Sequence, residues 1–228
     1  MRALGHPNGL FVTAIDNDVV SEANVGRQLY SLADIGQLKA VVTIHRINLF
    51  YGFDWKCEAS TIEQYWRNRT GSSQRVADIL VSCVDSKAAR RAIHDFVFAG
   101  PRYHYWIDLG NRERDGQVVL GQPGSDTNPA RLRCVTELYP ELLAVNEAED
   151  AMPSCSLRLS LASQGLYVND FAARYASQLL YGLFSQGGLD YHGVVFNAHR
   201  LQSRPIPVAS LDRSGATSKA HVERPRNM

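Results

Sequence analysis

The sequence lacks long apolar runs, and neither sign of charge is in excess. Its 24 Lys and Arg residues nearly match its 23 Asp and Glu residues, so the formal net charge is +1. That balance argues against the basic surface with which proteins bind nucleic acid or anionic membranes. Apolar runs such as residues 79–81 are far shorter than the ~20 residues of a membrane span. The first residues lack the apolar core of a signal peptide. We therefore expect a cytoplasmic protein with neither a membrane nor a nucleic-acid partner.

Cysteine and lysine are both scarce. The four cysteines include no Cys-x-x-Cys pair, so the spacing of a zinc ribbon is missing, and in a cytoplasmic chain they are expected to be reduced. Cys83 falls within a predicted buried strand and is expected to be a core residue. Only four basic residues are lysines, which leaves few to carry a specific role: Lys39, Lys56, Lys87 and Lys219.

The first half of the chain alternates short apolar segments with amphipathic ones. Residues 10–15 and 78–84 are predicted to be buried strands, the first of them parallel because its apolar residues do not alternate with polar ones. Helices with one apolar face are predicted over about 35–50 and from about Ser86 to the Gly100-Pro101 stop. This order of strands and helices is typical of a parallel α/β sheet.

The second half adds antiparallel strands and one long helix. The helix is predicted over 169–184 and ends at Gly187-Gly188. The predicted strands form a hairpin, 103–109 with 117–120 joined through Asp115-Gly116, and a final pair, 191–197 with 204–208, whose prolines place the last strand at a sheet edge.

Polar side chains gather where the predicted strands end. In a parallel α/β sheet, ligands bind beyond the carboxyl ends of the strands. The first strand ends in Asp16-Asn17-Asp18, where a carboxylate can accept both hydroxyls of a ribose, and the second buried strand ends at Asp85. Between them, Asn24, Arg27 and Lys39 supply an amide, a guanidinium fork and a point charge, a combination that suits a polyphosphate.

Each of these residues also has a plain structural interpretation. Asp16 and Asp18 are of the type that forms turns, and Asp85 could cap the helix that follows it. Lys39, in the first turn of a predicted helix, is unfavourable toward the helix dipole, which favours an anion nearby. An acidic residue that closes a strand also binds the ribose of NAD, so an NAD-dependent oxidoreductase is an alternative function. No Tyr-x-x-x-Lys pair supports that alternative.

The string from Ile15 to Gln28 resembles the Asp-x-Asp-x-Val…Ser-Asn-x-x-Arg-Gln motif of the ThiF/MoeB family, the bacterial relatives of ubiquitin-activating enzymes. Gly36-Gln37-Leu38-Lys39 resembles the family's Gly-x-x-Lys, Asn48 falls in its Arg-x-Asn helix end, and Ser82-Cys83-Val84-Asp85 is similar to its Asp-Cys-x-Asp strand end. The resemblance covers about residues 10–208. It implies a Rossmann-like, three-layer α/β adenylation domain with a mixed sheet.

Three further segments resemble, more narrowly, the ThiF-related branch of the PRTRC cassette, a plasmid or integrative-element gene set with ubiquitin-like and conjugating-enzyme-like neighbours. These segments are Pro153-Ser154-Cys155-Ser156-Leu157, Leu109-Gly110-Asn111 with residues 116–121, and Asp190-Tyr191-His192-Gly193-Val194.

The resemblance also implies a reaction, in which ATP adenylates the C-terminal carboxylate of a small ubiquitin-like protein. Cys155 aligns with a cysteine that some members use to receive the activated acyl group or sulfur, and a buried structural cysteine is the alternative. The family's remaining roles fall on seven residues: Asp16 and Asp18 at the nucleotide, with Asp16 on the ribose; Asn24, Arg27 and Lys39 on the phosphates, with Gln28 nearby; and Asp85 beside Mg²⁺ and the α-phosphate.

Two family features have no counterpart in these residues: the Gly-x-Gly-Gly-x-Gly loop and the zinc cysteines. We therefore expect no zinc. We expect an activating domain over 1–209 that is truncated at its N-terminus and lacks the first strand, the glycine loop and the first helix. A disordered tail is expected over 210–228. Such a chain is expected to bind ATP very weakly, and a non-catalytic scaffold is a further alternative. The resemblance implies a homodimer, with a ubiquitin-like and a conjugating-enzyme-like protein as partners.

Overall fold

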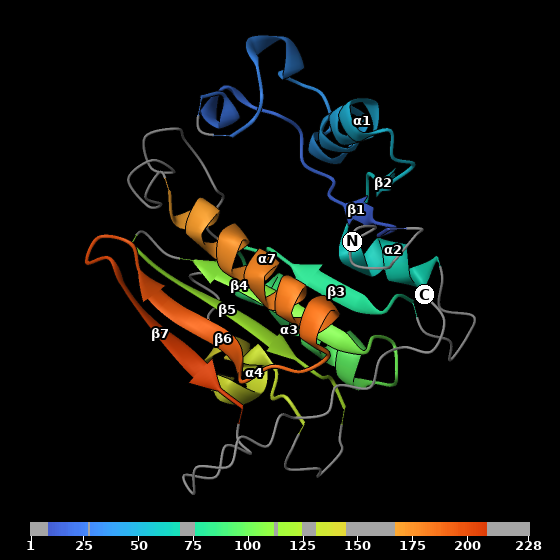
Figure 1. Cartoon of the computed structure of the whole chain (residues 1–228). Helices are drawn as coiled ribbons and strands as arrows, with labels where there is room; N and C mark the ends of the chain where they lie inside the picture. The colour runs from blue at the N-terminus through green and yellow to red at the C-terminus, as the bar shows by residue number, and fades with distance from the viewer. Residues whose placement is uncertain are drawn as a thin grey trace, which may run out of the picture. The chain divides into compact units, whose positions relative to one another are not determined.

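The computed structural model describes residues 9–26, 28–68, 76–111, 114–124, 131–144 and 167–208. The chain forms two compact units, one of residues 1–72 with 154–160 and the other of residues 73–153 with 161–228. Both are drawn in Figure 1. The predicted tail over 210–228 lies outside the described residues.

A short parallel strand pair forms the sheet of the first unit. Strand β1 (Thr13–Ile15) pairs in parallel with β2 (Lys56–Glu58), so the predicted parallel direction is confirmed. The prediction of a buried strand over 10–15 is wrong in two respects. The strand begins only at Thr13 and is half-buried, and the side chains before it are exposed, Leu10 by 37% and Phe11 by 70%.

Helix α1 (Lys39–Tyr51) confirms the predicted helix, with a later start. It begins at Lys39 because Leu38 is extended and forms an antiparallel bridge with Val19. Residues 32–34 form a separate 3-10 turn, η3 (Leu32–Asp34). It ends at Gly52, whose φ of 68° lies in the left-handed region that glycine adopts without a steric penalty. Among the described residues of this unit, two further helical segments are η2 (Glu22–Asn24) and α2 (Ile62–Arg67).

The second unit contains a five-stranded mixed sheet, in the order β3-β4-β5-β6-β7. Only β3 and β4 run parallel, and the other neighbours are antiparallel. The strands are β3 (Ile79–Ser82), β4 (Tyr105–Asn111), β5 (Asp115–Gly121), β6 (Tyr191–Asn197) and β7 (Gln202–Pro207).

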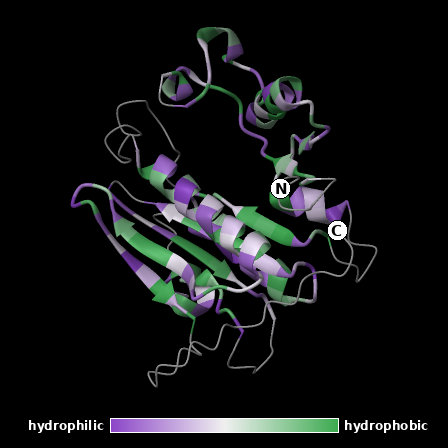
Figure 2. Ribbon diagram, viewed as in Figure 1, coloured by the Kyte–Doolittle hydropathy of each residue, from purple (hydrophilic) through white to green (hydrophobic). Residues whose placement is uncertain are grey.

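Helices cover both faces of this sheet. Figure 1 shows α7 (Val168–Gln186, orange) lying across one face, where its Ala172 packs into the main core with Ile107 of β4. Successive strand residues point to opposite faces, and the next residue, Asp108, contacts Arg90 of α3 (Lys87–Phe98) instead. The three layers are therefore α3, the sheet and α7, which confirms the predicted mixed α/β fold. Figure 2 shows the central strands as mostly apolar and α7 as alternately apolar and polar.

The predicted hairpin and final strand pair are confirmed, with one correction at the hairpin. Asp115 and Gly116 begin β5 rather than forming the turn. A Cβ at Gly116 would lie 2.2 Å from the Phe196 ring, so the strand needs glycine there for close packing. Strand β7 is the sheet edge, as its prolines predicted.

The second unit also contains two short helices and the loop that follows β3. Helices α4 (Val135–Leu138) and η4 (Pro140–Leu143) follow β5 in the chain. Strand β3 ends at Ser82, so Cys83 lies in the loop beyond it and is exposed. The prediction that Cys83 is a core residue is therefore wrong. Within the described ranges, no helix has both the length and the apolar character to cross a bilayer.

Candidate functional site

Asp16 forms a tight turn directly after β1. Its backbone N–H donates to the carbonyl of Glu58 at 3.1 Å, and its Oδ1 accepts the N–H of Asp18 at 2.8 Å. One carboxylate oxygen is therefore used by the turn, as the plain structural interpretation of Asp16 predicted. The other oxygen takes no hydrogen bond from the described residues of this unit, and it can accept one from a ligand.

Backbone pairing brings Lys39 to the same turn, across 21 positions of sequence. The carbonyl of Asp18 accepts the N–H of Lys39 at 2.9 Å, and the N–H of Val20 donates to the carbonyl of Gln37 at 2.8 Å. The Nζ of Lys39 lies 2.8 Å from Oδ2 of Asp18, and the two side chains are 18% and 64% exposed. The structure therefore places the partly buried ammonium of Lys39 against Asp18, which is two residues after Asp16 in the turn.

Asn24 is buried in the segment between these residues. Its amide oxygen accepts the N–H of Ser21 at 2.9 Å and the hydroxyl of Ser21 at 3.1 Å, while its carbonyl accepts the N–H of Gln28 at 2.9 Å. The amide oxygen thus caps the η2 turn, and the Nδ2 group is the part of this side chain that can donate to a phosphate. Arg27 and Cys155 lie outside the described residues.

Asp85 lies in the second unit, in the loop between β3 and α3. Ser86, and not Asp85, caps α3, because its Oγ accepts the N–H of Ala89 at 3.0 Å. The capping interpretation of Asp85 is therefore wrong. Its side chain is exposed and takes no hydrogen bond from the described residues of this unit.

A buried ion pair lies at the end of β3, and sequence reasoning missed it. The carboxylate of Asp108 accepts the Nε of Arg90 at 3.1 and 3.2 Å and the hydroxyl of Ser82 at 2.7 Å. Burial raises the pKa of Asp108, and the charge of Arg90 opposes that shift. The sequence did contain a signal for this pair, because Asp108 is the single charged residue of the otherwise apolar segment 105–109. A charge buried in such a strand needs a partner.

A second ion pair that the sequence reasoning missed orders the turn before α1. Asp34 is buried and accepts the N–H of Ser31 at 2.6 Å, the hydroxyl of Ser31 at 2.8 Å and the Nη2 of Arg46 at 2.7 and 2.8 Å. The bonds from Ser31, followed by Arg46, hold the pKa of Asp34 below its usual value. The Ser-x-x-Asp spacing, typical of a capped turn, was the available signal.

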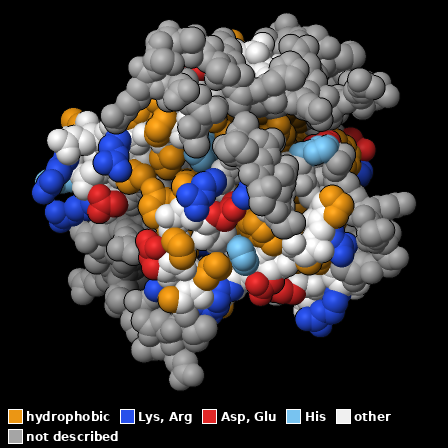
Figure 3. All heavy atoms as spheres, turned by 90° about the horizontal axis from the view of Figure 1, so that it is seen from below, with side chains coloured by type: hydrophobic (Ala, Val, Ile, Leu, Met, Phe, Trp, Pro, Cys, Tyr) orange, Lys and Arg blue, Asp and Glu red, His pale blue; other side chains and the backbone are white. Residues whose placement is uncertain are grey.

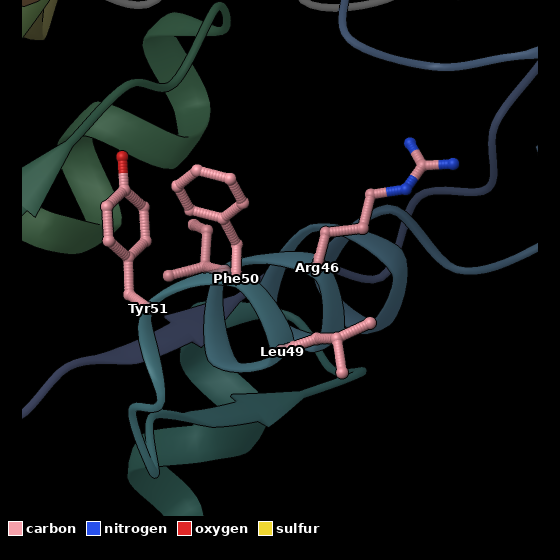
Figure 4. A pocket seen from close by; sticks show the side chains of 5 residues that line it. Arg46, Leu49, Phe50 and Tyr51 are labelled. Atoms are coloured by element: carbon pink, nitrogen blue, oxygen red, sulfur yellow. The ribbon is translucent and has the colours of Figure 1, made fainter.

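The loop after α1 is fixed by Asn48. Its Nδ2 donates to the carbonyl of Trp55 at 2.9 Å, and its Oδ1 accepts the N–H of Trp55 at 3.0 Å. A surface pocket in this unit is lined by α1 alone and contains none of the predicted site residues. Figure 4 shows its lining, with Phe50 and Tyr51 projecting on the same side of the helix; the lining residues are Arg46, Ile47, Leu49, Phe50 and Tyr51.

Charge and metal-ligating residues are dispersed over the described part of the chain. No group of three or more His, Cys, Asp or Glu side chains there could hold a metal ion by itself. On the face drawn in Figure 3, acidic and basic side chains are interspersed with apolar ones.

These features define a Rossmann-like α/β domain with acidic and basic side chains after its first strand. The sequence profile of the ThiF family matches residues 11–214, and the chain therefore belongs to the ThiF family. No curated protein matches the sequence.

Among solved structures, E. coli MccB with ATP is similar in fold, with a TM-score of 0.58 and 15% identity over 86% of this chain and 56% of that one. E. coli MccB with MccA-N7isoASN gives a TM-score of 0.57 and 16% identity over 86% and 57%. PaaA gives 0.50 and 14% identity over 85% and 63%. The chain thus spans a little more than half the length of MccB.

Proposed function

We propose that this chain uses ATP to adenylate the C-terminal carboxylate of a small protein or peptide. The observation that carries the proposal is the turn after β1, where the Nζ of Lys39 lies 2.8 Å from Asp18, two residues beyond Asp16. A carboxylate for ribose hydroxyls beside a partly buried cation suits a nucleotide. Membership of the ThiF family and the likeness to a structure of MccB with ATP support nucleotide binding.

The described residues of the first unit have distinct roles in this proposal. Asp16 accepts the ribose hydroxyls through its unused oxygen, and Nδ2 of Asn24 donates to the phosphates. Lys39 binds a phosphate oxygen on the side of its ammonium that faces away from Asp18. Arg27 and Gln28 complete the phosphate contacts. A carboxylate oxygen of the partner then forms a bond to the α-phosphorus while the bond to pyrophosphate breaks, and these donors neutralise charge on the phosphate oxygens.

Asp85 is the residue that we assign to Mg²⁺. Its exposed carboxylate follows β3, and Ser86 caps the next helix, so Asp85 is not needed for that role. Mg²⁺ is typically held in proteins by one or two carboxylates together with substrate phosphates, which fits a single carboxylate here. When bound, the ion would neutralise phosphate charge. We assign no role to zinc.

The partner we propose is a small ubiquitin-like protein within a PRTRC-type cassette, with a conjugating-enzyme-like protein as the next acceptor. MccB was solved together with MccA, which supports a partner beyond the nucleotide. The thiolate of Cys155 would take the acyl group from the adenylate as a thioester, with AMP as the leaving group. We propose a cytoplasmic homodimer, and the exposed side chains of Leu49, Phe50 and Tyr51 on α1 support self-association.

Calorimetric titration of Mg²⁺ and ATP into three proteins tests the nucleotide site: the natural chain, Lys39→Ala and Lys56→Ala. Lys56 is a matched control because its Nζ also pairs with a carboxylate, that of Asp54, at 2.7 Å. We expect Lys39→Ala to weaken ATP binding at least tenfold and Lys56→Ala to change it less than twofold. Equal affinity in all three proteins would contradict the site, and displacement of ATP by NAD would favour the oxidoreductase.

A further inference from the structure

We infer that Arg90 is a positioning residue, which sets the conformation of the loop that carries Asp85. The inference rests on the proposed function only for its consequence in catalysis. The loop consists of residues 83–86, between β3 and α3.

The guanidinium of Arg90 connects the sheet interior to this loop. Its Nε donates to both carboxylate oxygens of Asp108, at 3.1 and 3.2 Å, and its Nη2 donates to the carbonyl of Val84 at 3.0 Å. Arg90 is only 6% exposed and Asp108 is 0% exposed. One buried side chain therefore fixes the backbone one residue before Asp85.

Asp108 is itself held in place from β3. The hydroxyl of Ser82 donates to Oδ1 of Asp108 at 2.7 Å, and the same oxygen of Ser82 accepts the indole N–H of Trp106 at 2.7 Å. Ser82 and Asp108 are also register partners in the parallel pairing of β3 with β4. The position of Arg90 is thus determined by rigid strands rather than by the loop.

Stability alone does not account for this ion pair. A buried ion pair is often no more stabilising than apolar residues of the same volume, because both charges must leave water. Apolar residues could not donate to the carbonyl of Val84, however. Ser86 already caps α3, so the bond from Arg90 is a separate restraint on the loop.

Lysine at position 90 separates charge from positioning. The two sets of acceptors of Arg90 are bound by different nitrogen atoms, Nε and Nη2. A lysine has one nitrogen, which can neutralise Asp108 but cannot occupy both positions. Arg90→Lys therefore keeps the ion pair and releases Val84.

Cys83 provides a reporter within the loop. Cys83 is an exposed residue, although the surrounding protein and the charge of Asp108 raise the pKa of its thiol to about 11. Its alkylation rate by iodoacetamide, measured at one fixed pH and resolved by mass spectrometry of its peptide, follows the loop conformation.

Arg131→Lys in the same unit is the matched control. The Nη1 of Arg131 donates to the carbonyl of Gln122 at 2.6 Å, and its guanidinium also pairs with Glu137. Gln122 follows β5, which is antiparallel to β4, so it lies at the opposite sheet end from the loop.

The experiment compares the natural chain with Arg90→Lys and Arg131→Lys. We expect Arg90→Lys to change the alkylation rate of Cys83 at least threefold and Arg131→Lys to change it less than 1.5-fold. In pyrophosphate exchange, Arg90→Lys should lower kcat at least tenfold while KM for ATP changes less than threefold. An unchanged alkylation rate in a folded Arg90→Lys protein would overturn the inference.

A second variant tests the inference if the Arg90→Lys protein does not fold. Ser82→Ala removes one bond to Asp108 and should change Cys83 alkylation at least twofold, and an unchanged rate would overturn the inference. Alkylation needs no turnover. If the natural chain shows no exchange while Arg90→Lys alters alkylation, the proposed function fails and the positioning role of Arg90 stands.

Discussion

Replacing Asp18 by asparagine should tighten the binding of ATP. In the structure, Oδ2 of Asp18 lies 2.8 Å from Nζ of Lys39. In our account Asp18 holds the ammonium in place, and a phosphate oxygen binds to the other side of the ammonium. Once ATP is bound, the Asp18 carboxylate is a negative charge next to the phosphates, and the Asp18→Asn change removes that repulsion.

The size of the effect follows from the geometry. A phosphate oxygen on the far side of Nζ, at the same 2.8 Å, would lie about 5.6 Å from Oδ2 of Asp18. In water, two unit charges at that separation repel by about 0.7 kcal/mol, which corresponds to about a threefold change in affinity. The stability cost is small, because an exposed ion pair contributes roughly 0–1 kcal/mol.

The assay is calorimetric titration of ATP with Mg²⁺ into the natural chain, Asp18→Asn and the control Asp54→Asn. Asp54 pairs with Lys56 at 2.7 Å and has no role in the proposed site. We expect about threefold tighter binding for Asp18→Asn, no change for Asp54→Asn, and a smaller difference in high salt. Threefold weaker binding for Asp18→Asn would refute this reasoning and make Asp18 a direct nucleotide ligand.

Two further predictions concern the second unit. Gly121→Ala should lower the free energy of unfolding by about 1–3 kcal/mol, because the added Cβ would lie 2.4 Å from Cα of Cys134. Calorimetry measures the change, and the control is Gly110→Ala, whose added Cβ meets only a flexible side chain at 3.3 Å. Burial lowers the pKa of His192, whose Nδ1 bonds the carbonyl of Leu120 at 2.8 Å, so protonation favours the unfolded chain. Stability in urea titrations should therefore be full above about pH 6.5 and fall as the pH drops below it, and a His192→Asn variant that keeps this slope would contradict the assignment.

Local signals predicted the helices well. The apolar period of α1 and α7 and the glycines after them, Gly52 and Gly187, are properties of a few adjacent residues, and both glycines adopt the left-handed conformation that ends a helix. The hairpin and the final strand pair were predicted from short apolar segments and the turn residues and prolines near them. The short strand β1 was overextended, because its apolar residues Leu10 and Phe11 remain exposed.

Contacts between distant segments were only partly visible in the sequence. The sequence indicated that Asp18 and Lys39 belong to one site, but not that they form an ion pair, which depends on the pairing of their backbones. The link between Arg90 and Asp108 depends on the register of β3 with β4, and that register is set by the whole sheet. The sequence left two roles open for Asp85, a metal ligand and a helix cap. The structure excludes the second role, because Ser86 caps α3.

The most direct test of the account is exchange of labelled pyrophosphate into ATP, with Mg²⁺ and a ubiquitin-like protein that ends in glycine. Two forms of that protein are compared, one with a free C-terminal carboxylate and one with a C-terminal amide. We predict exchange with the carboxylate and none with the amide, because only the carboxylate can attack the α-phosphorus. Equal exchange with both forms, or none with either, would contradict the proposal that this chain adenylates a C-terminal carboxylate.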